Sequence, residues 1–327
     1  MTLLELVNKY LCQINYMHEI HIKVIVNPEA GSRSVGRRWP FISRQLQKAG
    51  LSFDYEFTKG RGQATEIARR AIDESYNYLI AVGGDGTVNE VANGILGSSK
   101  SRNVLLGVIC AGTAHAFACS LHIPEDNNDV NAYSFLNAEK GTLIDVGLVQ
   151  FWNRGRPLEH FFLNEASVGF SAETVDAWDS LPVLPGNKSN YLLRNIEGYI
   201  TLIKHRNKVA RIQIGDFVES ASILTLIVSN GQYCANKMMI SPHANLNDGL
   251  LNAVVATNMS KYELLKIRPT LYKGQHINHP KVKEIETKFV AVESQEGLLV
   301  EADGEILGVC PASFRIIPSA LSVVIPA

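Results

Sequence analysis

The run from Gly83 to Thr87 combines three glycines with an acid and a hydroxyl. It follows an expected buried strand, Tyr78–Val82, and precedes a helix expected to begin near Val88. Glycines let a backbone turn sharply and approach a ligand closely, and a helix N-terminus offers free N–H groups to a phosphate. Because an acid beside phosphates is repelled unless a cation bridges them, Asp85 indicates Mg²⁺ or a ribose hydroxyl. The alternative is a tight turn in which Asp85 or Thr87 caps the helix.

Small, hydroxyl and basic residues also follow three other expected strands. Asn27 to Ser32 follows the first strand, Thr58 to Gly62 follows the second, and Ala111 to Thr113 follows the fourth. The carboxyl ends of parallel strands meet at one edge of a sheet, where such folds bind ligands. The general richness of loops in glycine and serine explains one or two of these segments, but it explains all four poorly. Together the four loops predict a site for a nucleoside triphosphate.

Two Asp-Gly turns in the second half of the chain carry further acids. Asp303-Gly304-Glu305 lies between two expected strands, where an Asp-Gly pair is a strong hairpin signal that needs no function. Two carboxylates this close can also raise one another's pKa, which suits a general base. Asp248-Gly249 enters another expected strand, and its residues alone indicate an ordinary turn.

Residues 21–141 are expected to form an α/β domain with a doubly wound parallel sheet, because strands alternate with helices along this stretch. The expected strands are His21–Val26, Leu51–Phe57, Tyr78–Val82 and Leu105–Ile109. The expected helices are Val35–Ala49, Gln63–Glu74, Val88–Leu96, Ala114–Leu121 and Asp129–Glu139.

Residues 142–327 are expected to form a second, mostly antiparallel β-sandwich-like domain, because β-branched runs now dominate and helices are few. Residues 1–20 are an N-terminal extension, and the domain boundary lies between Lys140 and Asp145. The expected strands are Leu143–Phe151, His160–Val168, Val209–Gly215, Ala221–Ser229, Leu250–Thr257, Lys283–Val292, Leu298–Glu301, Ala312–Ile317 and Leu321–Ile325. The expected helices are Ala172–Trp178, Asn190–Lys204 and Lys261–Leu265.

The composition indicates a globular protein that does not coat nucleic acid. The chain has 327 residues, 46% of them hydrophobic, with 31 basic against 32 acidic side chains. No apolar run approaches the roughly 20 residues that span a bilayer. Met1–Glu19 lacks the core and cleavage site of a signal peptide and indicates a short amphipathic helix, with Met17 as an alternative start. Five scattered cysteines without a CxxC predict reduced thiols in a cytoplasmic protein.

In both halves the chain resembles the diacylglycerol kinase-like lipid kinases, a family that includes bacterial diacylglycerol kinases and sphingosine kinases. The resemblance runs in order from about residue 21 to the C-terminus, and its first-half motifs are Asn27-Pro28 with Gly31, Gly83 to Val91, and Gly112-Thr113-Ala114. The second half continues it with Phe162 to Phe170, Ser229 to Tyr233, Ile240-Ser241-Pro242, Asp248 to Leu251, and Asp303-Gly304-Glu305. The glycine-rich run alone is shared with NAD kinases, whereas the ordered set is far more specific. No Walker or protein-kinase motif is present.

The resemblance implies an ATP cradle and a base that receives the proton of a lipid hydroxyl. Either member of the Asp303 and Glu305 pair fits the base, and Glu305 is preferred. The residues implied to bind ATP are Asn27, Thr58, Gly83, Gly84, Asp85, Gly86, Thr87, Val88, Asn89, Glu90, Gly112 and Thr113.

The resemblance also implies two magnesium sites. Asp85 would act in catalysis through Mg²⁺, and Asp145 is a second candidate acid near it. Asn245, Asp248 and Leu250 match a structural Mg²⁺ loop that uses two backbone carbonyls and one carboxylate, and hard oxygen ligands of that kind suit magnesium.

The acceptor is less clear, because the chain departs from the bacterial pattern at one motif. Bacterial members usually follow Gly-Thr-Ala with Asn-Asp-Phe-Ala, whereas this chain has His115 to Ala118, which is closer to sphingosine kinases. Glu173 and Asp176 would then pair with an amino head group, or they are solvated acids on a helix. Ala177 to Pro185 is either a loop that caps the core or a mouth through which an acyl chain enters.

These observations predict an ATP-dependent lipid kinase of phospholipid metabolism that phosphorylates diacylglycerol or a sphingoid-like lipid. The expected partner is a lipid at the membrane surface, with transient peripheral contact because the sequence has no dense Lys/Arg cluster, and a homodimer is an open option. The alternatives are an NAD kinase-like enzyme with a soluble acceptor and a homologue that binds nucleotide or lipid without catalysis.

Overall fold

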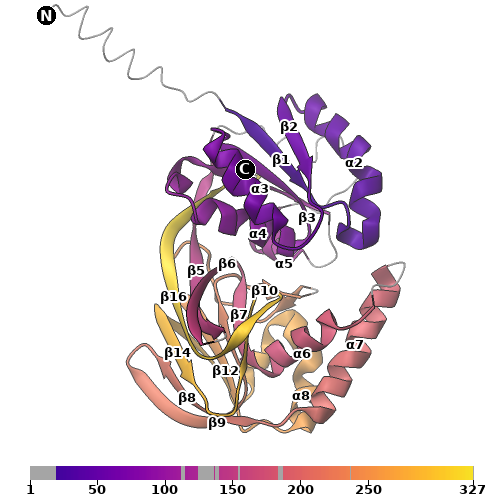
Figure 1. Ribbon diagram of the computed structural model, residues 1–327. Helices are drawn as coiled ribbons and strands as arrows, with labels where there is room; N and C mark the ends of the chain where they lie inside the picture. Colours follow the sequence, from indigo (N-terminus) through magenta and orange to yellow (C-terminus); the bar gives the residue numbers. More distant parts are fainter. Residues whose placement is uncertain are drawn as a thin grey trace, which may run out of the picture.

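The computed structural model describes residues 20–111, 115–123, 136, 140–153, 155–182, 187–235 and 237–326. The helix expected over Met1–Glu19 lies outside these residues, as does nearly all of the one expected over Asp129–Glu139. The described chain has two lobes, an α/β lobe and a β-rich lobe, joined by long strands (Figure 1).

The first lobe contains the expected parallel sheet. Strands β1 and β3 are almost wholly buried runs of β-branched and aliphatic residues, as expected of strands covered on both faces. The order is β2-β1-β3-β4, and every neighbouring pair is parallel. The strands are β1 Ile22–Val26, β2 Phe53–Phe57, β3 Tyr78–Gly83 and β4 Leu105–Cys110.

Helices cover both faces of this sheet, as expected of a doubly wound fold. Helices α3 and α4 share one hydrophobic cluster with the sheet, and α2 contributes to a second cluster that also contains Tyr78 and Val82. Helix α4 begins at Asp85, three residues before the predicted start. The helices of this lobe are α2 Ala30–Lys48, α3 Gln63–Asp73, α4 Asp85–Leu96, η1 Ser101–Asn103 and α5 Ala116–Ser120.

The second lobe is the expected antiparallel β-sandwich-like domain. Its strands enclose a core of aliphatic and phenylalanine side chains. The long strand β9 pairs with β8 through its first half and with β7 and β12 through its second half. The strands are β5 Thr142–Asn153, β6 Arg156–Phe162, β7 Glu165–Gly169, β8 Lys208–Ile214, β9 Phe217–Ser229, β10 Tyr233–Cys234, β11 Met238–Met239, β12 Leu251–Thr257, β13 Val282–Thr287, β14 Phe289–Glu293, β15 Leu299–Ala302 and β16 Glu305–Val323. The helices are α6 Phe170–Asp179, α7 Asn187–Lys204, α8 Lys261–Ile267, η3 Arg268–Lys273 and η4 Gln275–Asn278.

Two of the predicted strands are each divided into two strands in the structure. The strand expected over His160–Val168 is two strands, β6 and β7, because the backbone turns at Leu163 and Asn164 to point its N–H groups at one carboxylate. The strand expected over Lys283–Val292 breaks at Lys288, since β13 pairs with β12 whereas β14 pairs with β8 and β16.

The long strand β16 connects the two lobes. It pairs with β5 along most of its length, and its last residues, Ser322 and Val323, pair in parallel with Leu105 and Leu106 of β4. It contains the strand predicted over Ala312–Ile317, whereas the one predicted over Leu321–Ile325 ends at Val323. The predicted domain division at residue 141 stays a prediction. The pairing of β16 with β4 shows that the end of the chain extends the sheet of the first lobe.

Candidate active site

A cavity of about 580 Å³ lies between the two lobes. The first lobe contributes the loops after β1, β2 and β3, and the second lobe contributes a cluster of acids and part of α6 and α7. Among the described residues its lining is Asn27, Glu29, Ala30, Gly31, Thr58, Lys59, Gly60, Arg61, Ala64, Gly84, Asp85, Gly86, Thr87, Glu90, Ala116, Asn164, Glu165, Val175, Trp178, Asp179, Arg194, Cys234, Ala235, Glu301, Asp303 and Gly304.

Two of the predicted ATP-binding loops are joined by a side-chain hydrogen bond. Asn27 Nδ2, after β1, donates to Thr87 Oγ1 of α4 at 3.0 Å, and the Asn27 side-chain oxygen accepts from the Glu29 N–H at 3.1 Å. A Cβ on Gly83 would lie 2.5 Å from Thr87 Oγ1, so this glycine is required for packing. A Cβ on Gly86 would meet no atom within 4 Å, which leaves open space at the start of α4 for a ligand.

Asp85 contacts a neighbouring helix. Its carboxylate accepts from the N–H groups of Ala116, at 3.0 Å, and Phe117, at 3.2 Å, at the start of α5. Burial raises the pKa of Asp85 and outweighs these two hydrogen bonds, which lower it. The predicted alternative, in which Asp85 or Thr87 caps the helix of the glycine run, is wrong in detail: Gly84 is the N-cap of α4, and no side chain caps it.

Other predicted ATP-binding residues are divided between the cavity and the core. The Thr58 N–H donates to the Val26 carbonyl at 2.8 Å, and Thr58 lines the cavity. The Glu90 carboxylate accepts from the Gly62 and Ala64 N–H groups and so caps α3. Val88 packs into the hydrophobic cluster beneath α4. Gly112 and Thr113 lie outside the described residues.

Asp303 is the most strongly hydrogen-bonded acid of the cavity. Its Oδ2 accepts from Asn89 Nδ2 and from the Leu163 N–H, each at 2.6 Å, and its Oδ1 accepts from the Asn164 N–H at 3.0 Å and the Glu165 N–H at 3.1 Å. Asn89 belongs to α4, whereas the three N–H groups belong to the turn after β6 and to the first residue of β7. Asp303 therefore holds the two lobes together at the cavity.

Glu301 and Glu165 join Asp303 in one acid cluster. Glu301 is fully buried and accepts from Ser167 Oγ and the Gly304 N–H, each at 2.6 Å. Burial raises the pKa of Glu301 to about 7 and that of Asp303 to about 6. Burial, with the charges of Glu301 and Asp303, raises the pKa of Glu165, whose Oε2 is buried without a partner among the described residues.

Glu301 and Glu165 were not among the site residues predicted from the sequence. The available signal was an acid within an apolar strand, since Glu301 interrupts the buried run of β15. Glu305 was the preferred base in that prediction. In the structure Glu305 begins β16, pairs with Ala302 across the hairpin, and does not line the cavity, whereas Asp303 does.

Apart from Asp85, the residues predicted to bind metal do not line the cavity. Asp145 is buried and accepts from the Gly249 N–H at 2.6 Å and the Ser319 N–H at 2.7 Å, so it fixes the loop before β12. In that loop Asn245 and Asp248 are exposed, and Asp248 accepts from the Leu250 N–H at 2.9 Å. Within the described part of the chain, no three His, Cys, Asp or Glu side chains are grouped to hold a metal ion.

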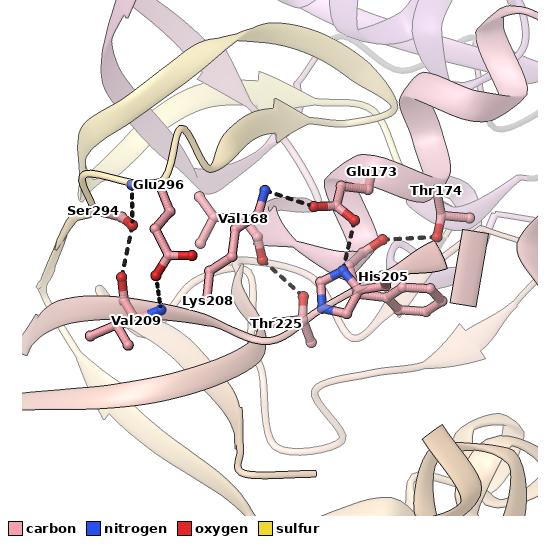
Figure 2. A network of polar contacts seen from close by, with 10 residues as sticks. Val168, Glu173, Thr174, His205, Lys208, Val209, Thr225, Ser294 and Glu296 are labelled. Atoms are coloured by element: carbon pink, nitrogen blue, oxygen red, sulfur yellow. Dashed lines mark hydrogen bonds and ion pairs between the residues drawn. The ribbon is translucent and has the colours of Figure 1, made fainter. Parts of the chain in front are cut away.

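Glu173 lies in an ion-pair network that anchors α6 (Figure 2). His205 Nδ1 lies 2.6 Å from one Glu173 oxygen, and Lys208 Nζ donates to the other at 3.0 Å. Burial raises the pKa of Glu173, but the hydrogen bonds and charges of His205 and Lys208 lower it overall. Glu173 is therefore neither a solvated acid nor free to bind an amino head group, and both predicted interpretations of it are wrong. Asp176, one turn further along α6, is exposed and does not line the cavity.

The C-terminal end of α6 forms one wall of the cavity. Trp178 Nε1 donates to the Arg194 carbonyl of α7 at 2.9 Å. Asp179 forms an ion pair with Arg61 at 3.3 Å, which joins α6 to the loop after β2 in the other lobe. Both residues belong to the segment Ala177 to Pro185, which was predicted to be a mouth or a capping loop, and residues 183–186 of it lie outside the described part.

Comparison with protein families assigns both lobes. Residues 21–149 match the family model described as diacylglycerol kinase catalytic domain. Residues 164–325 match the model described as YegS C-terminal NAD kinase beta sandwich-like domain.

Curated proteins and solved structures agree with this assignment. A diacylglycerol kinase of Staphylococcus aureus is 31% identical over 293 residues, which are 89% of this chain and 88% of that protein. One of Staphylococcus saprophyticus is 28% identical over 305 residues, 93% of this chain and 95% of that protein. A crystal structure of a diacylglycerol kinase from Bacillus anthracis has the same fold, with a TM-score of 0.68, 19% identity, and coverage of 94% of this chain and 97% of that one. Yeast NADH kinase complexed with NADH is a more distant fold match, with a TM-score of 0.50, 8% identity, and coverage of 94% and 83%.

Proposed function

Since the chain belongs to the diacylglycerol kinase-like family of lipid kinases, we propose that it transfers the γ-phosphoryl group of ATP to the hydroxyl of diacylglycerol. The observation that carries the proposal is that one cavity is lined both by the three strand-end loops and by the acid cluster. We also propose that it acts in the cytoplasm at the membrane surface, in phospholipid biosynthesis.

The loops of the first lobe are suited to the triphosphate. The N-terminus of α4 offers backbone N–H groups and the positive end of a helix dipole, and Gly86 leaves the space in front of it open. Lys59 and Arg61 line the cavity beside it and supply positive charge for phosphate oxygens. The hydrogen bond from Asn27 to Thr87 fixes the loop after β1 against the same helix end.

The acid cluster is suited to receive the proton of the acceptor hydroxyl. A general base works best when its pKa is near the working pH, and burial raises the pKa of Glu301 to about 7 and of Asp303 to about 6. Because their charges interact, we assign proton acceptance to the Glu301 and Asp303 pair as a unit. Glu305 lacks contact with the cavity and has no part in this step.

Magnesium accompanies ATP in this proposal, and the cavity's donors fit it. Mg²⁺ is usually held by one or two carboxylates together with substrate phosphates, so it needs no preformed group of three acids. The unpartnered Oε2 of Glu165 and the carboxylate of Asp85 are the cavity oxygens that would hold it. The bound ion would neutralise charge on the transferring phosphoryl group.

Diacylglycerol is the acceptor class that the described side chains favour. A sphingoid base carries an amino group, and the sequence offered Glu173 and Asp176 as its partners. Glu173 is occupied by His205 and Lys208, and Asp176 does not line the cavity. Val175, Trp178 and Ala235 instead give this end of the cavity an apolar wall that suits a glycerolipid without an amine.

An acceptor panel tests the proposal. Purified protein is incubated with labelled ATP and Mg²⁺ and with dispersed dihexanoylglycerol, sphingosine or NAD, and the phosphorylated product is measured. We expect product with dihexanoylglycerol and loss of at least about a hundredfold of that rate in Asp303→Asn. Product with NAD alone, or no product with any acceptor despite ATP binding, would overturn the proposal.

A further inference from the structure

Helix α7 has large apolar side chains on its outward face. Leu192, Ile196, Tyr199, Ile200 and Ile203 are 61%, 47%, 42%, 36% and 71% exposed. Leu192, Ile196, Tyr199 and Ile203 recur every three or four residues, with Ile200 beside Tyr199, so the five lie on one stripe of the helix. Thr201 and Leu202 are buried on the opposite side, so the stripe is additional to the face that packs on the domain. Most helices of a soluble protein present polar side chains to water at such positions.

Helix α8 and the turn after it extend this stripe into a wider surface. Tyr262, Leu265 and Tyr272 are 64%, 44% and 42% exposed. The two elements touch, since Lys261 Nζ donates to the Ile203 carbonyl and Arg268 donates to Asn195 of α7. Figure 1 shows α7 along the outer edge of the second lobe, with α8 near its C-terminal end. We call these eight side chains the α7–α8 face.

Exposed basic residues lie on the same elements as the α7–α8 face, among them Lys204, Lys261, Lys266 and Lys273. Residues 187–206 and 261–273 each contain four Lys or Arg and one acid. The acid of the second stretch, Glu263, is already paired with Lys281 at 2.9 Å. The sequence itself has no dense basic run, because these two stretches are far apart in the chain and only the fold brings them together. An exposed apolar stripe flanked by Lys and Arg matches an anionic lipid surface, which offers acyl chains below negative head groups.

The same helix also reaches the cavity. Arg194 of α7 lines the cavity, and its carbonyl accepts the hydrogen bond from Trp178, which lines it as well. A surface that touches the bilayer along α7 would therefore bring the bilayer next to a helix that lines the cavity. We propose that the α7–α8 face docks the protein on an anionic bilayer. This inference rests on the proposed function for the identity of the lipid, but the docking itself does not require turnover.

Vesicle flotation without ATP tests the docking. The protein is mixed with vesicles of phosphatidylcholine alone or of equal parts phosphatidylcholine and phosphatidylglycerol. We expect binding to the mixed vesicles, weakened by salt, and a loss of at least about tenfold in the partition coefficient of Ile196→Glu/Ile203→Glu. Phe217→Glu is the matched control, since Phe217 is 53% exposed at the β8–β9 hairpin, and it should bind as the wild type does.

Two further measurements separate the alternatives. The double variant should phosphorylate dispersed dihexanoylglycerol at the wild-type rate but lose activity on diacylglycerol in vesicles. If the wild-type protein phosphorylates no acceptor at all, the proposed function is wrong, and the flotation experiment alone tests the docking. Light scattering reports the oligomeric state. Unchanged vesicle binding by the double variant would overturn the inference. If, in addition, the wild-type protein were a dimer and the double variant a monomer, a second copy of the chain would be the partner that binds the α7–α8 face.

Discussion

The two carboxylates of the Asp303-Gly304-Glu305 turn have different surroundings although only one residue separates them. Asp303 accepts four hydrogen bonds and lines the cavity. Glu305 is the first residue of β16, pairs with Ala302 of β15 and does not line the cavity. We predict that Asp303→Asn lowers kcat by about a hundredfold or more, because it removes a proton acceptor from the coupled pair, and that Glu305→Gln stays within about threefold of wild type. Steady-state kinetics with dihexanoylglycerol measures both values.

The control for this prediction is thermal unfolding of the same two variants. Asparagine keeps the size of Asp303, but its NH2 group cannot accept the hydrogen bonds that one of the two carboxylate oxygens accepts, so thermal unfolding measures how much stability the variant loses apart from the chemistry. Equal loss of kcat in both variants, or a full rate in Asp303→Asn, would show that the pair is not the base.

At the scale of the element, helix α6 depends on one partly buried acid. We predict that Glu173→Gln lowers the free energy of unfolding by about 1–2 kcal/mol, because it removes the charge that faces Lys208 and His205. Helix α6 also carries Val175 and Trp178 into the cavity wall, so the KM for diacylglycerol should rise severalfold while the KM for ATP stays unchanged. Urea unfolding and acceptor kinetics check the two effects.

Asp176→Asn is the matched control for Glu173→Gln. Asp176 lies on the same helix and is exposed, so its variant should keep wild-type stability and KM. If the two variants behave alike, the network of Figure 2 does not position α6.

The elements were largely predictable because their signals are local. The strands of the first lobe are short apolar runs between turn residues, and they occur within two residues of the predicted limits. The division of the strand expected over His160–Val168 was not predictable, because its cause is the carboxylate of Asp303, some 140 residues away. The glycine run indicated the cavity correctly, yet the partners of Asp85 and Glu90 are N–H groups of other helices, which no local pattern reveals.

At the scale of the whole molecule, pairing between distant segments joins the lobes. Strand β16 places Ser322 and Val323 beside β4, and Asn89 contacts the turn at Asp303. Composition and local periodicity do not encode which strands become neighbours, so the sequence predicted two domains and could not predict that the end of the chain extends the first sheet.

His160 lies at the junction of the lobes, and it predicts a pH dependence of stability. Its Nε2 is 3.2 Å from Asn89 Oδ1, and burial lowers its pKa from 6.5 to about 4. The unfolded chain therefore binds more protons than the folded one between these values, so stability is complete above pH 6.5 and falls as the pH decreases towards 4. Because the ring is only partly buried, we expect a loss of about 1–2 kcal/mol between pH 7 and pH 5 from this residue. Urea unfolding at both pH values should show that His160→Gln loses less stability than wild type does over this interval, and equal losses would show that His160 is not the group responsible.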